Sequence, residues 1–145
     1  MKNPANTSLT KLNLSLLKFG TLQSIIMSIY HFYIPFQFNW SIYLKQESPT
    51  INWSLFSLNN YFSFNLLILS LFLAFYILKR PNKKEVISVL SLLLLLFWFF
   101  SILYQLISPM PLPESLKWIE TVLIGVATIN GITFLIPTTS LLKNK

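Results

Sequence analysis

The sequence predicts an all-α polytopic membrane protein, with four transmembrane helices in an up-down bundle and both termini in the cytoplasm. Three observations lead to this fold class. Of the 145 residues, 54% are hydrophobic and only 10% are charged, whereas soluble domains are roughly 25% charged. Four apolar runs follow one another, each of about 20 residues and so long enough to cross a bilayer. Cations collect beside alternate ends of these runs.

The first predicted span covers residues 19–36 and follows an N-terminal segment, 1–18, that is rich in Asn, Ser, Thr and Lys. We expect this segment to lie in the cytoplasm, disordered at first and then forming a helical turn in the membrane interface. The apolar run is not a secretory signal peptide, because Tyr30, His31 and Tyr33 occupy the positions where small residues would form a cleavage site. It is therefore predicted to remain as a transmembrane helix.

Pro35 is expected to end or kink the first span, because proline lacks a backbone N–H and restricts the residue before it. Trp40 and Tyr43 come next, and such aromatic residues gather at the boundary between membrane and water. For 41–58 the sequence favours a short helix that lies in the interface, with an ordinary loop as the alternative.

The second and third predicted spans, 59–78 and 86–107, are separated by a turn that contains four cations. The third span is the most hydrophobic part of the chain. A stiff connection with three prolines leads to the fourth span, 116–136, which we expect to end before Pro137.

The distribution of Lys and Arg predicts the orientation. Four spans place the N-terminal segment, the turn after the second span and a cytoplasmic tail, 137–145, on one side of a single transmembrane domain, 19–136. Nine of the eleven Lys and Arg residues lie on that side, and only Lys45 and Lys117 lie on the other. Because positive residues concentrate in cytoplasmic loops, we expect both termini to be cytoplasmic in a multi-pass protein of the inner (plasma) membrane.

The composition excludes several classes of function. The chain has no cysteine, so it carries no thiolate nucleophile, disulfide or thiolate metal site. Its single histidine excludes bis-histidine haem ligation within one chain. The net charge of +7 does not indicate nucleic-acid binding, because the lysines stand beside apolar runs. We expect no cofactor, no metal and no nucleic acid, and the lipid bilayer as the main partner.

Small residues at helical spacing mark the predicted contact faces between helices. In lipid there is little hydrophobic drive for helices to associate, so small side chains that allow close approach tend to face neighbouring helices. In the first span these are Gly20, Ser24 and Ser28, and in the fourth span they are Ala127 and Gly131.

Polar side chains from all four spans are predicted to gather in one layer near the non-cytoplasmic side. His31 lies about 7.5 Å along the helix axis from the end of the first span, and Glu120 lies at a similar distance inside the fourth. The other expected members come from the second and third spans: Asn59, Asn60, Tyr104 and Gln105.

This layer has two interpretations. In the first, its members hydrogen-bond across helices and stabilise the bundle, each contributing about 0.6–2 kcal/mol. In the second, His31 and Glu120 form a partly buried pair that binds a ligand head group or handles protons, because ionisable groups inside membranes are costly and often functional. The distance between these two side chains decides between the interpretations.

The end of the first span carries the pattern His31-x3-Pro35-x2-Phe38-x-Trp40, which resembles uncharacterised small four-helix bacterial integral membrane proteins. The His-Phe-x-x-Pro helix end, together with a span that carries an early Glu and a later Gly, is also similar to the DoxX-like group of small four-helix membrane proteins. The second resemblance implies a link to respiratory quinol oxidation or thiosulfate metabolism, and the first implies the fold alone.

The sequence favours a non-enzymatic membrane protein over an enzyme. It contains no nucleophile–base pair and no phosphate-binding glycine loop, so no catalytic residue is predicted. On this hypothesis the protein is an accessory subunit of another membrane protein or a homo-oligomer. The alternative is a site for a quinone, a lipid or a proton in the polar layer, where Trp98, Phe99 and Tyr104 could line an aromatic pocket. A third hypothesis is a small exporter, which requires a carboxylate deep in the membrane.

Overall fold

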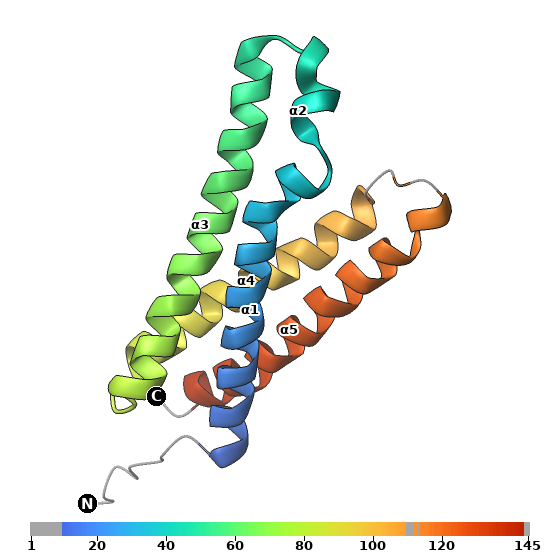
Figure 1. Ribbon diagram of the computed structural model, residues 1–145. Helices are drawn as coiled ribbons and strands as arrows, with labels where there is room; N and C mark the ends of the chain where they lie inside the picture. Colours follow the sequence, from blue (N-terminus) through green and yellow to red (C-terminus); the bar gives the residue numbers. More distant parts are fainter. Residues whose placement is uncertain (1–9, 110–111, 113, 144–145) are drawn as a thin grey trace, which may run out of the picture.

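The structure is a computed structural model that describes residues 10–109, 112 and 114–143, and four long helices dominate it (Figure 1). These helices are α1 (Lys11–Gln37), α3 (Pro49–Lys79), α4 (Lys84–Ile107) and α5 (Trp118–Lys143). Three short elements lie in the connections: α2 (Trp40–Tyr43) and the 3-10 helices η1 (Leu44–Gln46) and η2 (Glu114–Leu116). The long helices pack in an antiparallel bundle, which confirms the predicted all-α four-helix fold.

All four long helices are long and apolar enough to cross a membrane. The protein is therefore a multi-pass membrane protein, as its hydropathy predicts. The antiparallel order places Lys11, the turn between α3 and α4, and Lys143 at one end of the bundle, which we call the terminal end (Figure 1). The short elements α2, η1 and η2 lie at the opposite end, which we call the far end (Figure 1).

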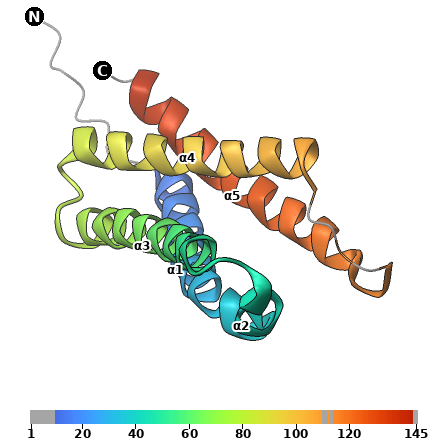
Figure 2. The same ribbon diagram turned by 90° about the horizontal axis from the view of Figure 1, so that it is seen from above.

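The four long helices form a ring in which each packs mainly against two neighbours. Helix α1 packs against α3 and α5, and α4 packs against the same two helices. Figures 1 and 2 show that the α1–α3 pair and the α4–α5 pair lie close together toward the terminal end and diverge toward the far end. This divergence leaves space between the pairs in the half of the bundle where the polar layer was expected.

Helix α1 is longer than the predicted first span. It begins at Lys11, where the Thr10 side chain accepts a hydrogen bond from the Asn13 amide, so the expected interfacial turn is the continuous start of the membrane helix. Pro35 does not end the helix, which runs on to Gln37. The last turn is still hydrogen-bonded, because the Phe38 amide donates to the Ile34 carbonyl at 3.0 Å. Residues 1–9, part of the expected disordered start, lie outside the described residues.

Helix α3 also begins earlier than the predicted second span. The expected interfacial helix over 41–58 is replaced by α2 and η1, after which α3 starts at Pro49. The Ser48 hydroxyl caps this start by accepting from the Ile51 amide at 3.3 Å, and proline is favoured in the first turn of a helix. At 31 residues α3 is about 46 Å long, so it exceeds the roughly 30 Å of the hydrocarbon layer.

Helix α5 continues past the predicted end of the fourth span. Pro137 lies inside the helix and is fully buried, and the helix runs on to Lys143. Membrane helices tolerate proline where neighbouring side chains and local adjustments satisfy the freed backbone groups. Of the expected cytoplasmic tail, 137–145, the described part is therefore helical, and residues 144–145 lie outside the described residues.

The interior of the bundle mixes large apolar side chains with small polar ones, and the outside is apolar. Leu17, Leu66, Leu94 and Phe134 are fully buried in the core. Hydroxyl and amide side chains are buried among them, including Ser24, Ser28, Ser63, Ser70, Ser91, Asn130 and Thr138. Leu, Ile and Phe side chains cover the outer faces of all four long helices. This distribution is typical of helices that meet lipid outside and pack through small residues inside.

Candidate ligand-binding cleft

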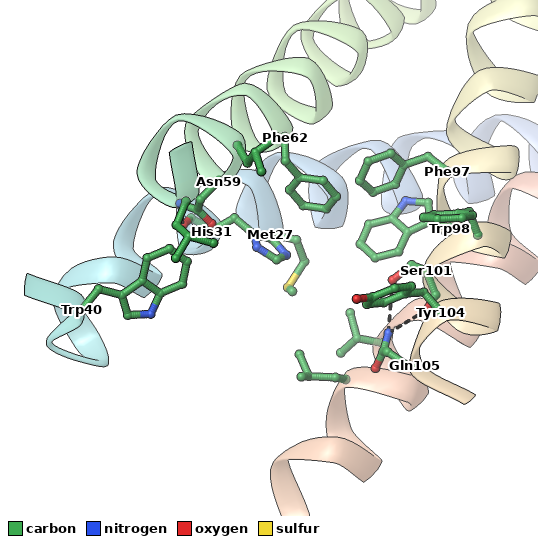
Figure 3. Close-up of a pocket in the computed structure, with 15 residues that line it drawn as sticks. Met27, His31, Trp40, Asn59, Phe62, Phe97, Trp98, Ser101, Tyr104 and Gln105 are labelled. Carbon is green, nitrogen blue, oxygen red and sulfur yellow. Dashed lines mark hydrogen bonds between the residues drawn. The ribbon is translucent and has the colours of Figure 1, made fainter. Parts of the chain in front are cut away.

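The space between the two diverging helix pairs contains a cleft of about 420 Å³ at the far end (Figure 3). Its walls come from all four long helices and from α2. The lining is largely aromatic and aliphatic, with a few polar side chains: Met27, His31, Trp40, Leu55, Leu58, Asn59, Phe62, Phe97, Trp98, Phe100, Ser101, Tyr104, Gln105, Leu123 and Val126. A neighbouring groove of about 670 Å³ between α1 and α5 shares Met27, Leu123 and Val126 with this cleft.

His31 lies on the wall formed by α1 and α3 (Figure 3). Its backbone carbonyl accepts a hydrogen bond from the Asn59 side-chain amide at 2.9 Å, which ties α3 to α1 at this level. The imidazole ring packs edge-on against Phe62, with ring centroids 4.6 Å apart. Within the described part of the chain, neither imidazole nitrogen forms a hydrogen bond. The ring is therefore held in place by packing, and its polar atoms are available to a molecule in the cleft.

The opposite wall belongs mainly to α4, where Ser101, Tyr104 and Gln105 face the His31 side (Figure 3). The Gln105 side-chain amide donates to the Ser101 carbonyl and to the Ser101 hydroxyl, both at 3.1 Å. The nitrogen of this amide is thus occupied within α4, and its oxygen remains as an acceptor for a molecule in the cleft. Phe62 and Phe97, with centroids 4.9 Å apart, bring α3 and α4 together beside the cleft.

Trp98 anchors the α4 wall to the middle of the bundle. Its indole Nε1 donates to the Ser24 hydroxyl of α1 at 3.0 Å, and the side chain is only 3% exposed. Since α1 and α4 lie across the ring from each other, this bond crosses the interior and joins the α1 wall to the α4 wall.

The structure collects four of the six expected polar-layer residues in the cleft. His31, Asn59, Tyr104 and Gln105 line it, whereas Asn60 is exposed on α3 and Glu120 belongs to neither the cleft nor the neighbouring groove. Glu120 lies in the first turn of α5, where a carboxylate is favoured by the helix dipole.

His31 and Glu120 do not form an ion pair. At the surface, Lys117 pairs with Glu114, its amine 2.7 Å from the carboxylate, and neither His31 nor Glu120 takes part in an ion pair within the described residues. The second interpretation of the polar layer requires a contact between His31 and Glu120, and the structure does not contain it. Among the residues described, no three His, Cys, Asp or Glu side chains gather in a way that could hold a metal ion.

Of the small residues of α1, Gly20 lies against α5, nearer the terminal end than the cleft residues Met27 and His31. Ser24 and Ser28 are fully buried, and a Cβ atom added to Gly20 would lie 2.6 Å from the Thr133 hydroxyl. On α5, Ala127 is buried, and a Cβ atom on Gly131 would make an ordinary contact of 3.5 Å with an Ile102 methyl.

Sequence reasoning missed much of the cleft lining. Met27, Phe62 and Phe97 were not expected to line it, because an aromatic or thioether side chain does not stand out within an apolar span, and Trp40 was expected only at the membrane–water boundary. A cross-helix bond from the Thr138 hydroxyl to the Ser91 hydroxyl, at 2.9 Å, was also missed. The one usable signal was the position of Ser91 and Trp98, seven residues apart on the same face of α4.

Compared with known protein families, with curated proteins and with solved structures, the chain matches none. The resemblance to the DoxX-like group gains no support from these comparisons.

Proposed function

We propose that this polytopic membrane protein is a non-enzymatic bundle that binds an apolar, membrane-soluble molecule with a carbonyl oxygen, such as a quinone, in the far-end cleft. One observation carries the proposal. The His31 imidazole borders a cleft of about 420 Å³ without a hydrogen bond to any described residue. An imidazole N–H is a donor that a carbonyl oxygen can accept.

The shape and lining of the cleft support this class of ligand. Small-molecule sites are concave, of about 300–1,000 Å³, and apolar with a few convergent polar groups. Here the rings of Phe62, Trp98 and Tyr104 can pack against a flat ring, while His31 offers a donor at one side. The cleft opens between helix pairs whose outer faces are apolar, so a molecule dissolved in the bilayer can reach it from the side.

Intrinsic tryptophan fluorescence provides a direct test, because Trp40 and Trp98 line the cleft. Purified protein in detergent is titrated with decylubiquinone, whose ring quenches tryptophan emission, and with 1-decanol as a tail without the ring. We expect saturable quenching by decylubiquinone only. His31→Leu should raise its Kd about tenfold, the equivalent of one lost hydrogen bond of about 1.4 kcal/mol.

The matched control is Tyr33→Leu, on the same helix but 59% exposed and outside the cleft. This variant should leave the Kd unchanged. Quenching that never saturates, or that falls equally in the two variants, would contradict a ligand site at His31.

A structural role as an accessory subunit or homo-oligomer is the second candidate, and the bonds between helices favour it. Asn59 to His31, Trp98 to Ser24 and Thr138 to Ser91 each join two helices. Mass spectrometry of gently purified protein separates the two candidates: a copurified quinone or similar molecule supports the binding role, and a copurified protein subunit without a small molecule supports the structural one.

The exporter hypothesis receives less support from the geometry. Such a protein needs a carboxylate that faces an internal path, and Glu120 lines neither the cleft nor the neighbouring groove.

A further inference from the structure

A separate groove of about 340 Å³ lies between α1 and α3 in the half of the bundle nearest the terminal end. Leu22 and Ile25 of α1 and Ala74 and Ile77 of α3 form its apolar walls. Lys18 also lines it, one turn nearer the terminal end than Leu22. The groove thus combines an apolar channel with a cation at one side, and it shares no residue with the far-end cleft.

Thr21 adds a polar group with no partner. Its side chain lines the groove and is 3% exposed, and its hydroxyl oxygen is buried without a hydrogen bond to any described residue. A buried hydroxyl without a partner destabilises a protein, whereas an acceptor oxygen in the groove would satisfy it once the Thr21 side chain turns its hydroxyl toward the groove. Thr21 lies about 4.5 Å deeper along α1 than Lys18, since three residues separate them.

The surroundings of the groove are positively charged. Lys18 is exposed and forms no ion pair within the described part of the chain. Helix α3 ends at Lys79 and is followed by Arg80, directly after the groove residues Ile77 and Leu78. All four acidic residues of the chain are described, and Glu85 is the one at the terminal end.

We propose that this groove binds one anionic phospholipid from the leaflet at the terminal end. The phosphate lies against Lys18 and the cations at the end of α3. The ester carbonyl, which sits deeper than the phosphate in a bilayer, accepts a hydrogen bond from the Thr21 hydroxyl. An acyl chain runs along Leu22, Ile25 and Ala74. Lysine suits this position because its stem packs on apolar surface while its ammonium reaches the head-group level. The site is independent of the function proposed for the far-end cleft.

Native mass spectrometry of the detergent-purified full chain tests the charge preference. The protein is titrated with phosphatidylglycerol and with phosphatidylcholine that carry the same acyl chains. We expect phosphatidylglycerol to bind more tightly, and Lys18→Gln to reduce the preference about fivefold, because one cation near anionic lipid is worth about 1 kcal/mol. Lys45→Gln, the same charge change at the far end, should leave the preference unchanged. Equal binding of the two lipids, or equal effects of the two variants, would overturn the proposal.

Thr21→Val tests the hydroxyl with two responses of opposite sign. In lipid-free detergent the variant should unfold at a higher temperature than the unmodified protein, because it removes a buried hydroxyl without a partner. The rise in Tm on adding phosphatidylglycerol should be smaller in the variant. A general folding defect lowers the first value, so it cannot imitate this pattern. An undiminished lipid response would rule out the carbonyl contact.

Ala74→Phe tests the acyl channel, because its ring would fill the groove while all charges stay in place. We expect this variant to lose retained phosphatidylglycerol. Leu71→Phe, at an exposed position of the same helix outside the groove, should retain it. Equal retention by the two variants would show that no acyl chain lies along Ala74.

Discussion

Trp98 of α4 donates its indole N–H to the Ser24 hydroxyl of α1 at 3.0 Å, across the interior of the bundle. The two helices are not neighbours in the ring, since each packs mainly against α3 and α5. Both side chains are buried. The bond lies at the edge of the cleft that Trp98 also lines, so it links the packing of the bundle to the geometry of the candidate site.

Trp98→Phe should lower the free energy of unfolding by about 1–2 kcal/mol, because it removes the donor and leaves the Ser24 hydroxyl buried without it. Thermal and denaturant unfolding in detergent measure this change. Trp53→Phe is the control, since Trp53 is 67% exposed and makes no such bond, and it should have little effect.

A double-mutant cycle isolates the bond itself. Ser24→Ala should be destabilising in the unmodified protein and nearly neutral when Trp98 is already Phe, because the shared hydrogen bond can be lost only once. Additive effects of the two substitutions would mean that the bond contributes nothing to stability.

Gly20 and Gly125 make a matched pair for the contact between α1 and α5. A Cβ atom at Gly20 would lie 2.6 Å from the Thr133 hydroxyl and 3.1 Å from the Phe134 ring, whereas a Cβ atom at Gly125 would meet nothing within 4 Å. We expect Gly20→Ala to lower the unfolding free energy by about 1–3 kcal/mol through overpacking. Gly125→Ala should raise it by about 0.5–1 kcal/mol, since alanine is the better helix former.

Unfolding of the two variants in the same detergent decides this point. A Gly20→Ala protein as stable as Gly125→Ala would show that α1 and α5 can move apart at this point without loss of unfolding free energy. The fold would then not require the close approach at Gly20.

Much of the fold could be predicted because four apolar runs and the spacing of small residues are local properties of the chain. The helix bounds were harder to predict. Helix α3 starts at the Ser48 cap and Pro49, within a segment that composition assigns to the interface. Pro35 and Pro137 are buried inside helices, although a lone proline predicts a helix end. These outcomes depend on bonds and packing between elements, which the sequence pattern does not display.

The cleft depends on geometry that lies outside any single helix. His31, Asn59, Tyr104 and Gln105 could be assigned to one level from their positions along the spans, and all four line the cleft. Residue spacing assigns Glu120 to the same level, but Glu120 does not line the cleft, because helical rotation and the divergence of the two helix pairs decide which side chains meet. Neither quantity can be read from residue spacing.

The positive-inside distribution predicts that the terminal end faces the cytoplasm. An alkaline phosphatase fusion after Lys145 should be inactive, because the enzyme matures only outside the cytoplasm, and a fluorescent protein fused there should be bright. A phosphatase inserted after Glu47, in the far-end connection between η1 and α3, should be active. Strong phosphatase activity at Lys145 would show that the orientation is the opposite one. The far-end cleft and the groove near the terminal end would then each face the other leaflet.

Thr138 and Thr139 test whether polar bonds between helices stabilise the terminal half of the bundle. The Thr138 hydroxyl is buried and donates to the Ser91 hydroxyl of α4 at 2.9 Å. The adjacent Thr139 is exposed and donates only to carbonyls of its own helix. Thr138→Val should therefore lower the unfolding free energy by about 0.6–2 kcal/mol, the range for such bonds in membranes. Thr139→Val should leave the unfolding free energy close to that of the unmodified protein, because the bonds it removes lie within α5 and join no second helix. If both variants unfold at the same temperature as the unmodified protein, the bond between Thr138 and Ser91 contributes no measurable stability, and apolar packing alone holds α4 and α5 together at this level.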